Sequence, residues 1–310
     1  MTISLALVLE QTLNGLQYGV MLFLMAAGLT LVFGIMNLVN LAHGSLYMVG
    51  AYLATALTER TGSFVLGVAL ALPATLLVGV VVEIVALRTL YERDHLDQVL
   101  ATFGLILFFN ELVAMIWGRA AIFTSVPPFL SGHFRVLPGL PYPTYRAVII
   151  LVGVAVAVLL WVLVTRTRLG MRIRAGASNR TMIAALGVDI RLLYTLVFGL
   201  GAALAGLAGA MAGPVYSVQP GMGEGILIQV FVVIVIGGIG SIRGAIVGAL
   251  VVGMADTLGR AFLKPMLATM ISPPAADKAG PALASMSIYL LMAAVLFFRP
   301  EGLFPARSRS

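Results

Sequence analysis

The stretch RTRLGMRIRAGASNRTMIAALGVDIR, residues 166–191, interrupts a chain that otherwise consists of long apolar blocks. It holds six arginines and a single acidic residue, Asp189. Short loops rich in Arg and Lys beside membrane spans face the cytoplasm. Placing this segment in the cytoplasm therefore fixes the direction in which the apolar blocks on both sides of it cross the bilayer.

The composition is typical of an integral membrane protein. Hydrophobic residues make up 61% of the 310 residues and charged residues 10%, with a mean hydropathy of +1.07. This leaves too little polar surface for a soluble globule. The apolar residues continue for about 20 positions at a time, which suits helices that cross ~30 Å of hydrocarbon and does not suit the alternating strands of a barrel. We expect a single all-α transmembrane domain over residues 1–310, a polytopic helical bundle with about 8 spans.

The net charge of +7 does not indicate a nucleic-acid-binding protein. The basic residues are divided among short loops, where they set membrane topology, and no polar, aromatic-rich domain carries them. The chain has no cysteine, which excludes disulfides, thiol catalysis and cysteine-ligated metals.

The order of the blocks predicts the topology. The tail after Phe298, with three arginines, should share the cytoplasmic side with residues 166–191, so an even number of crossings separates them. Residues 226–258 therefore contribute two crossings or none, and the run GGIGS interrupts them midway. Residues 88–97 should also lie inside. The N-terminus lies outside if both early blocks are full spans, and inside if one of them is re-entrant. The apolar blocks fall at 5–33, 36–57, 64–87, 98–117, 145–165, 192–213, 226–258 and 282–298.

Two interrupted stretches stand in comparable places in the two halves of the chain. They are GIMNLVNLAHGSLYMVGAY at Gly34–Tyr52 and GGIGSIRGAIVGALVVG at Gly237–Gly253. Each places a polar, glycine-bearing break before a helix rich in small residues. Corresponding breaks of this kind indicate a transporter with two related halves and unwound backbone near the pathway, although glycine also serves tight helix packing.

The breaks supply candidate pathway residues. Buried amides and imidazoles must be hydrogen-bonded, so the polar side chains of the first break either support the discontinuous backbone or line the translocation path. A carboxylate inside a span is often functional, and we expect Glu83 and Asp256 to reach water near span ends, which leaves Glu111 as the least explained acid. The candidates are Asn37, Asn40, His43, Gly44, Glu111, Gly237, Gly238 and Gly240.

The second half of the arginine-rich loop has the capping residues of a short helix. Ser178 or Asn179 can act as the N-cap, and Gly187 supplies a residue that tolerates positive φ after the helix. Met182, Ile183 and Leu186 form an apolar patch at helical spacing. We expect a cytoplasmic helix from about Asn179 to Leu186 that is stabilised in a groove of a partner protein.

The first half of the same loop needs no such explanation. Arg166, Arg168, Arg172 and Arg174 suit an ordinary basic loop that contacts anionic lipid headgroups.

No enzyme signature is present. The sequence lacks an HExxH pair, a GxSxG elbow and a phosphate-binding GxxxxGK[ST] loop, so we expect no catalytic residue, no bound metal and no cofactor in this chain. An ATP-independent carrier or channel is the main alternative to an ATP-driven transporter. A proton-coupled carrier normally needs a relay of acidic or His side chains across the membrane. One isolated Glu is weak evidence for such a relay.

Four motifs in order resemble the bacterial branched-chain amino acid ABC transporter permeases of the LivH type. They are the first break at Gly34–Tyr52, the loop at Arg166–Asp189, VIGGIGSIRGAIVGALVVGMAD at Val235–Asp256 and FFRPEGLF at Phe297–Phe304. The resemblance extends from about Gln11 to Phe304. Urea and short-chain amide permeases are similar at the same motifs, so the resemblance leaves the solute open among amino acids, urea or amides and aromatic acids.

The resemblance implies a multi-pass subunit of a bacterial inner-membrane importer. Such a subunit pairs with a second, related permease, is driven by two cytoplasmic ATPases that use ATP and Mg²⁺, and receives solute from a periplasmic binding protein. It also implies that the loop 166–191 contains a coupling helix for the ATPase. An Ala-Glu-Asp run of the family reads Ala177-Ser178-Asn179 here. The implied coupling residues are Ala177, Ser178, Asn179, Arg180, Met182, Ile183, Ala184, Ala185, Leu186 and Gly187.

Overall fold

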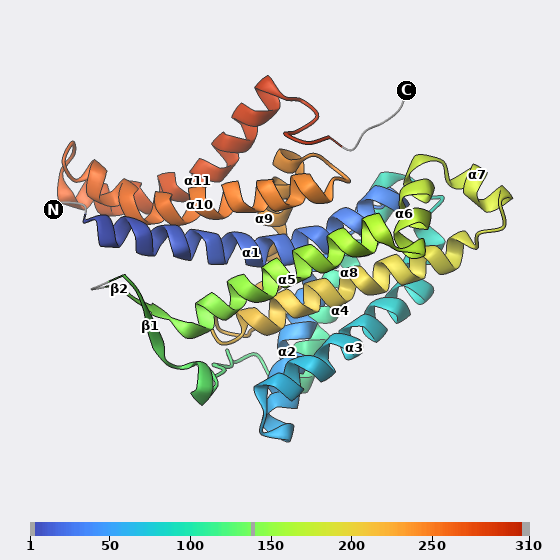
Figure 1. The fold of residues 1–310 in the computed structure, drawn as a ribbon, viewed down its shortest axis with the longest axis horizontal. Coiled ribbons are helices and arrows are strands. Elements are labelled where there is room, and N and C mark those ends of the chain that lie inside the picture. Colours follow the sequence, from blue (N-terminus) through green and yellow to red (C-terminus); the bar gives the residue numbers. More distant parts are fainter. Residues whose placement is uncertain (1–3, 138–139, 306–310) are drawn as a thin grey trace.

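The protein is an α-helical bundle. The computed structural model describes residues 4–137 and 140–305 (Figure 1). Its helices are α1 (Leu5–Met36), α2 (His43–Thr61), α3 (Phe64–Val82), α4 (His95–Trp117), α5 (Thr144–Arg166), α6 (Arg168–Ser178), α7 (Arg180–Ala185), α8 (Ile190–Ala212), α9 (Met222–Gly237), α10 (Ile242–Leu267) and α11 (Pro273–Phe298). A π-helical turn (Glu83–Leu87) and short 3₁₀ turns (Arg88–Leu90 and Pro128–Leu130) complete the helical part, and β1 (His133–Leu137) pairs antiparallel with β2 (Leu140–Pro143).

The predicted apolar blocks correspond closely to the observed helices. Within the part of the chain that the structure describes, seven helices are long and apolar enough to cross a membrane, counting the π and 3₁₀ turns after α3 as its continuation. The block 36–57 is not among them, because its first residues form the break at 37–42 and α2 itself is more polar. The block 226–258 is divided into the short α9 and the long α10, and the interruption predicted at GGIGS is confirmed.

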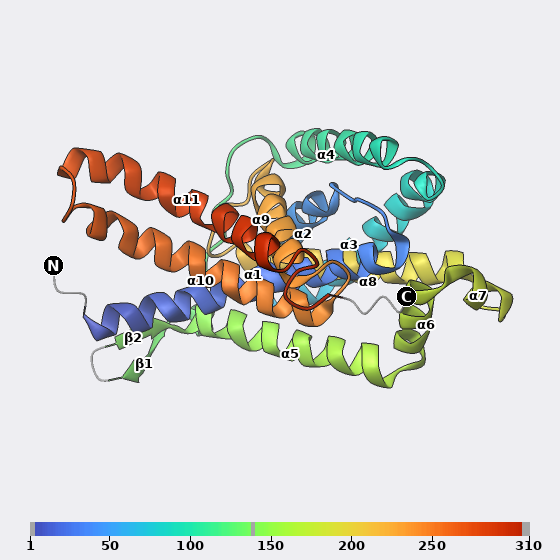
Figure 2. The same ribbon diagram turned by 90° about the horizontal axis from the view of Figure 1, so that it is seen from above.

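The ends of the bundle agree with the predicted sidedness. The N-terminal end of α1 and the β1–β2 hairpin lie at one end, while α6, α7 and the turn between α3 and α4 lie at the other (Figures 1 and 2). The tail after α11 packs against the break between α9 and α10, through hydrogen bonds from Leu303 N to Ile236 O and from Phe304 N to Gly237 O, 2.8 and 2.9 Å long. The segments assigned to the cytoplasm therefore share one end.

The centre of the bundle is the pair α1 and α8. Most of the apolar length of both helices is buried, whereas only a small part of α3, α4, α5, α10 and α11 is fully buried. Glycines permit the central helices to touch backbone to backbone. A Cβ on Gly50 of α2 would lie 2.2 Å from the Cα of Gly206 of α8. Small residues at such crossings replace the hydrophobic driving force that is missing inside lipid.

The two halves of the chain are related, although the corresponding breaks are not the two that the sequence suggested. Helix α8 packs on α2 and α3 of the first half, and α1 packs on α9 and α10 of the second half. Helix α2 also contacts α3 and α4. In the same way, α9 contacts α10 and α11. The series α1, α2, α3, α4 therefore corresponds to α8, α9, α10, α11. The break before α2 corresponds to the loop before α9, so the predicted pairing with the break before α10 is wrong by one element.

The caps of α3 and α10 support this correspondence. Gly62 and Gly240 both have positive φ, 66° and 78°. Each precedes a serine, Ser63 or Ser241, whose Oγ accepts a hydrogen bond from the backbone N–H three residues later. Two helices in equivalent positions thus begin with the same Gly-Ser cap.

Replacing Gly50 with alanine tests the close crossing of α2 and α8. The added Cβ meets backbone that cannot rotate away, so we expect Gly50→Ala to reduce stability by about 1–3 kcal/mol, the usual cost of overpacking. The measurement is the thermal unfolding midpoint of the purified protein in detergent.

Gly104→Ala is the matched control. Gly104 lies within α4, and a Cβ added there would have nothing within 4 Å of it, while alanine is the better helix former. The thermal unfolding midpoint of the Gly104→Ala variant should stay unchanged or rise slightly. Equal losses from both substitutions would contradict the role of Gly50 as a packing site.

Candidate functional site

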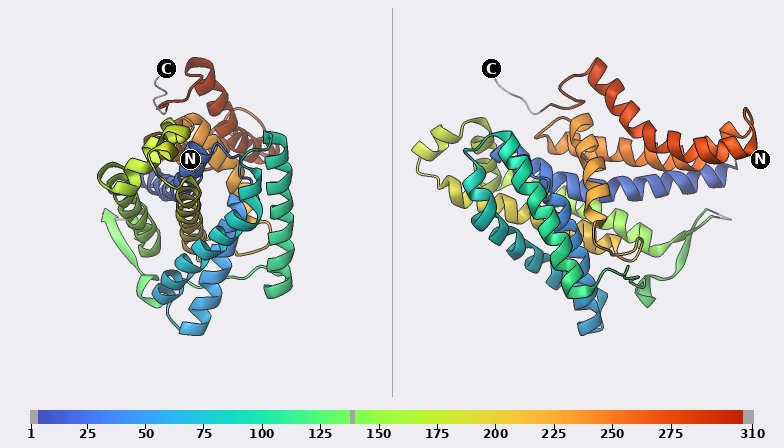
Figure 3. Two further views of the ribbon diagram at one scale, coloured as in Figure 1. Left: turned by 90° about the vertical axis from the view of Figure 1, so that its right-hand side faces the viewer. Right: turned by 180° about the vertical axis from the view of Figure 1, so that it is seen from behind.

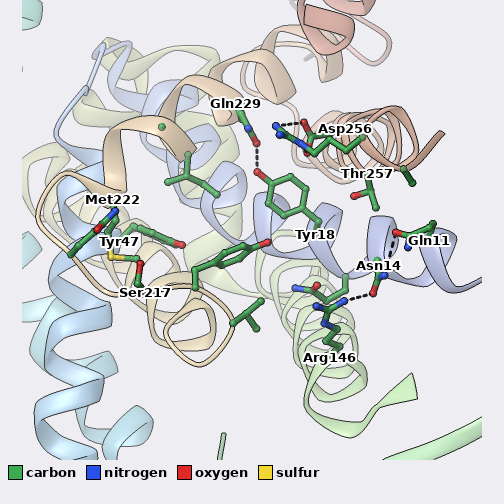
Figure 4. A pocket seen from close by; sticks show the side chains of 18 residues that line it. Gln11, Asn14, Tyr18, Tyr47, Arg146, Ser217, Met222, Gln229, Asp256 and Thr257 are labelled. Atoms are coloured by element: carbon green, nitrogen blue, oxygen red, sulfur yellow. Dashed lines mark hydrogen bonds and ion pairs between the residues drawn. The ribbon is translucent and has the colours of Figure 1, made fainter. Parts of the chain in front are cut away.

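A polar cavity of about 1050 Å³ lies toward the end of the bundle where α1 begins, and Figure 4 shows the side chains that line it. Four helices and the loop before α9 contribute most of its wall, and α5 adds one arginine. The lining residues are Gln11, Asn14, Gln17 and Tyr18 from α1, Tyr47 from α2, Arg146 from α5, Val215, Tyr216, Ser217 and Gln219 from the loop, Met222, Gly225, Ile226 and Gln229 from α9, and Asp256, Thr257, Arg260 and Ala261 from α10. We refer to it as the outer cavity.

The wall of the outer cavity carries both signs of charge. Asp256 and Arg260, one helical turn apart on α10, form a bidentate ion pair with two N–O distances of 2.9 Å. Across the cavity, Arg146 Nη1 donates to Asn14 Oδ1 at 2.5 Å. These groups can meet the carboxylate and the ammonium of a zwitterion separately.

Neutral hydrogen-bonding groups complete the wall. The hydroxyl of Tyr18 on α1 hydrogen-bonds Gln229 Oε1 on α9. Burial raises the pKa of Tyr216, in the loop before α9, above its ordinary value. Its phenol is therefore a neutral hydroxyl at physiological pH, and it adds a hydrogen-bond donor without adding charge.

The outer cavity ends where α2 and α9 meet. Gly44 and Gly223 are each the second residue of their helix, and each lies against the backbone of the other. Tyr47 and Met222, which line the cavity, lie within one turn of this contact. The close approach of the two helix starts thus closes the cavity near the middle of the protein.

The first break places its polar residues in different environments. His43 is completely buried, and its Nε2 lies 3.2 Å from the carbonyl oxygen of Met25 in α1. The side chain of Asn40 is also completely buried, and no described residue hydrogen-bonds its amide. Asn37 is exposed at the other end, in the left-handed conformation with φ of 51°. The outer cavity contacts none of these three, and their pathway role stays a prediction.

The glycines of the second break lie toward the cytoplasmic end rather than at the outer cavity. Gly237 contacts Gly244, and the left-handed Gly238, with φ of 106°, lies against the tail near Phe304. Gly240 lies against Gly34 near the end of α1. The two glycine-bearing stretches singled out from the sequence therefore meet in space.

The short helix expected in the arginine-rich loop is present. It is α7, and Asn179 is its N-cap, with Oδ1 accepting a hydrogen bond from Met182 N at 2.9 Å. Gly187 follows it with φ of 85°. The predicted cap and the predicted positive φ are both confirmed.

Two details of the loop differ from the prediction. The apolar patch is divided, because Ile183 is buried against its own chain while Met182 and Leu186 are 65% and 78% exposed. The first arginines are not in an irregular loop. Arg166 is the last residue of α5, and Arg168, Arg172 and Arg174 lie on α6, whose Thr167 cap and buried Ile173 anchor it to the bundle.

A second cavity, of about 430 Å³, lies between this loop and the end of α1. It is lined by Phe33, Gly34, Ile35 and Asn37 on one side and by Gly176, Ala177, Ser178, Asn179, Arg180 and Thr181 on the other. Ala177, Ser178, Arg180, Ala184 and Ala185 are all exposed. The segment from Ala177 to Gly187 is thus supported from below by α1 and α6 and open to solvent above. We call it the coupling segment.

The two remaining acids behave differently from expectation. Glu111 lies on the exposed side of α4, paired with Arg119 at 2.7 Å, and does not line the outer cavity. Glu83 does not reach water, as the sequence suggested, but is completely buried at the start of the π turn.

Glu83 is the centre of a hydrogen-bond network that sequence reasoning missed. Arg88 and Thr195 donate to Oε2 at 3.0 and 2.7 Å, and the hydroxyl of Tyr91 contacts Oε1. Burial first, and then the hydrogen bond to Glu83, raise the pKa of Tyr91. The network links the end of α3 to α8, which follows the coupling segment directly.

The chain is similar to transport proteins over almost its whole length. The protein family described as branched-chain amino acid transport system, permease component, matches residues 11–296. The permease protein BraD of a high-affinity branched-chain amino acid transport system in Pseudomonas aeruginosa is 32% identical over 95% of this chain and 95% of its own length. The permease protein LivH of Escherichia coli is 30% identical, covering 82% and 87%. No solved structure matches.

Replacing Glu83 with leucine tests the buried network. The substitution leaves Arg88 and two hydroxyl groups without their acceptor, so we expect a loss of about 2–3 kcal/mol of stability, near the lower end for a broken buried pair because Arg88 is one-third exposed. The thermal midpoint in detergent reports the loss.

Glu111→Leu is the matched control, since Glu111 and Arg119 are 62% and 74% exposed. A pair of that kind contributes about 0–1 kcal/mol. An undiminished midpoint for Glu83→Leu would contradict the structural role of the network.

Proposed function

This chain belongs to the family of branched-chain amino acid transport system permeases, and we propose that its outer cavity and coupling segment are the two working ends of one transport subunit. The chain is a multi-pass permease component of a branched-chain amino acid ABC transport system. In the proposed assembly it lies in the bacterial inner membrane beside a second, related permease. Two cytoplasmic ATPases bind ATP and Mg²⁺, and a periplasmic binding protein delivers a branched-chain amino acid or a related small polar solute.

The observation that supports the proposal best is the path of α1. This 32-residue helix contributes Gln11, Asn14 and Tyr18 to the outer cavity. Its last turn contributes Phe33 and Gly34 to the cavity under the coupling segment. One rigid, buried helix therefore contacts both the place where solute enters and the place where an ATPase would dock.

The geometry suits alternating access. The outer cavity is open to one side of the membrane, and the Gly44–Gly223 contact closes it from the other. Movement of the coupling segment would be transmitted through α6 and α1 to α2 and α9, which would part and release the solute inward. The subunit performs no bond chemistry, and ATP hydrolysis belongs to the partner ATPases.

The charges of the outer cavity suit an amino acid. Asp256, Arg260 and Arg146 offer opposite charges within one polar space. Met222 and Ile226 add apolar surface for a hydrocarbon side chain. Selection among similar amino acids is assigned to the binding protein, and the cavity provides general affinity for a small zwitterion.

Cross-linking tests the coupling segment. The chain has no cysteine, so a single Ala184→Cys variant of the complete complex can be treated with a thiol-to-amine reagent. We expect it to be joined to an ATPase subunit, because Ala184 is exposed on α7.

Phe129→Cys, at an exposed position near the opposite end, is the control and should give no such product. The coupling assignment fails if Ala184 and further cysteines across α7 give no ATPase adduct. The same preparation separates an importer from a carrier, because a carrier would transport alone in an ion gradient.

Removal of the Asp256 carboxylate tests the outer cavity. Asp256→Ala leaves Arg260 without its bidentate partner and removes the negative charge from the cavity wall. We expect ATP-driven uptake of branched-chain amino acid by proteoliposomes to fall at least about tenfold, the factor that corresponds to 1.4 kcal/mol.

Asp277→Ala offers a control on the neighbouring helix. Asp277 pairs with Lys264 at 2.9 Å, but both side chains are more than half exposed and outside the cavity. Uptake of branched-chain amino acid by the Asp277→Ala variant should change less than about twofold, since an exposed pair contributes about 0–1 kcal/mol. Equal effects of the two substitutions would remove the argument for the outer cavity.

A further inference from the structure

Glu224 is an acidic residue on the surface of the single chain. It is the third residue of α9, it is exposed, and it does not line the outer cavity. Asn110 of α4 donates a hydrogen bond to its Oε1 at 2.6 Å, and the Oδ1 of Asn110 accepts one from Gly221 N at 3.1 Å. The carboxylate is thus held in place on the surface where α4 and α9 meet.

The depth of Glu224 in the membrane can be estimated from its contacts with residues at known distances from the ends of two helices. Its partner Asn110 lies seven residues before the outer end of α4, or ~10 Å at the helical rise of 1.5 Å per residue. The adjacent Gly223 contacts Gly44, whose neighbour His43 contacts Met25, eleven residues before the inner end of α1, or ~16 Å. The two distances add up to roughly the ~30 Å thickness of the hydrocarbon, so Glu224 lies at mid-depth.

A carboxylate at mid-depth is costly when it faces lipid. Within the described residues, the hydrogen bond from Asn110 and the position of Glu224 in the first turn of α9 compensate this cost only in part. Among residues 4–137 and 140–305, no basic side chain forms an ion pair with Glu224. A hydrogen-bond donor or a positive charge from a neighbouring molecule would lower the cost further.

The side of α9 that carries Glu224 lies at the surface of the chain. Seen from behind, α9 lies between α4 and α11 (Figure 3). Ile228, one turn after Glu224, is 53% exposed on the same side of α9. Glu224 and Ile228 thus lie on a different side of α9 from Met222, Gly225, Ile226 and Gln229, which line the outer cavity.

We propose that the second permease chain of the transporter packs on this α4–α9 face and donates a hydrogen bond or a positive charge to Glu224. The proposal rests on the assembly given above, in which two related permeases pair. The α4–α9 face is the proposed surface of that pairing. The contact would also explain why the chain keeps a costly carboxylate there, since polar groups inside membranes connect helices.

Photo-cross-linking of the complete complex tests the surface. A benzophenone amino acid at Ile228 is expected to form an adduct with the second permease on irradiation. The matched control is the same amino acid at Val154, which is 53% exposed near the middle of α5. Val154 should give lipid adducts only.

Substitutions of Glu224 test the polar contact itself. Glu224→Leu removes the acceptor, and we expect at least roughly tenfold less second permease to copurify, as for a central contact of an interface. Glu224→Gln keeps an acceptor oxygen and should retain most of it. Full retention by the leucine variant would overturn the proposed contact.

The outcomes separate this proposal from the function on which it rests. A complex that contains a second permease but gives only lipid or water products at Ile228 would overturn the α4–α9 surface and leave the importer assignment intact. A preparation that transports without any second permease would overturn both.

Discussion

Backbone carbonyl and N–H groups inside a bilayer must find partners within the protein, and this constraint decides where the chain can break. The free carbonyls of Ile236 and Gly237 at the end of α9 are satisfied by the backbone of Leu303 and Phe304, nearly seventy positions along the sequence. The neighbouring helix α10 begins with the Ser241 cap. The end of α9 is thus covered by the tail, although Ile239 in the unwound segment stays half exposed, and the tail at Leu303 and Phe304 is part of the packed structure rather than an appendage.

The same constraint explains why the central helices are rich in glycine. A break or a short helix can be tolerated at mid-depth only if neighbouring backbones come close enough to exclude lipid, and side chains would prevent that approach. The Gly44–Gly223 and Gly50–Gly206 contacts provide it for α2. Because such contacts have no interlocking side chains, α2 and α9 can separate without dragging large groups past one another. A contact of this kind suits a point that must open during transport.

Sequence reasoning predicts what depends on local pattern and misses what depends on distant partners. The spans follow from apolar length, and α7 follows from Asn179 and Gly187, because a cap and a left-handed residue act within one turn. The outer cavity could not be predicted in this way, since Tyr18 and Gln229 are joined across 211 positions. The burial of Glu83 depends likewise on Thr195, on another helix. The correspondence of the halves was misassigned because glycine marks both a break and a close crossing.

The distribution of charge connects these features to function. Glu83 is surrounded by donors at the cytoplasmic end, Asp256 is paired beside the outer cavity, and Glu111 is paired at the surface. Each of these acids is neutralised by a basic residue within eight positions of its own, so each can be stable in the isolated chain. In the described parts of the chain, Glu224 has no basic partner, and its side-chain hydrogen bond comes from the amide of Asn110 on another helix. A costly group is thus left on the surface, as expected of a subunit that reaches its final stability within an assembly.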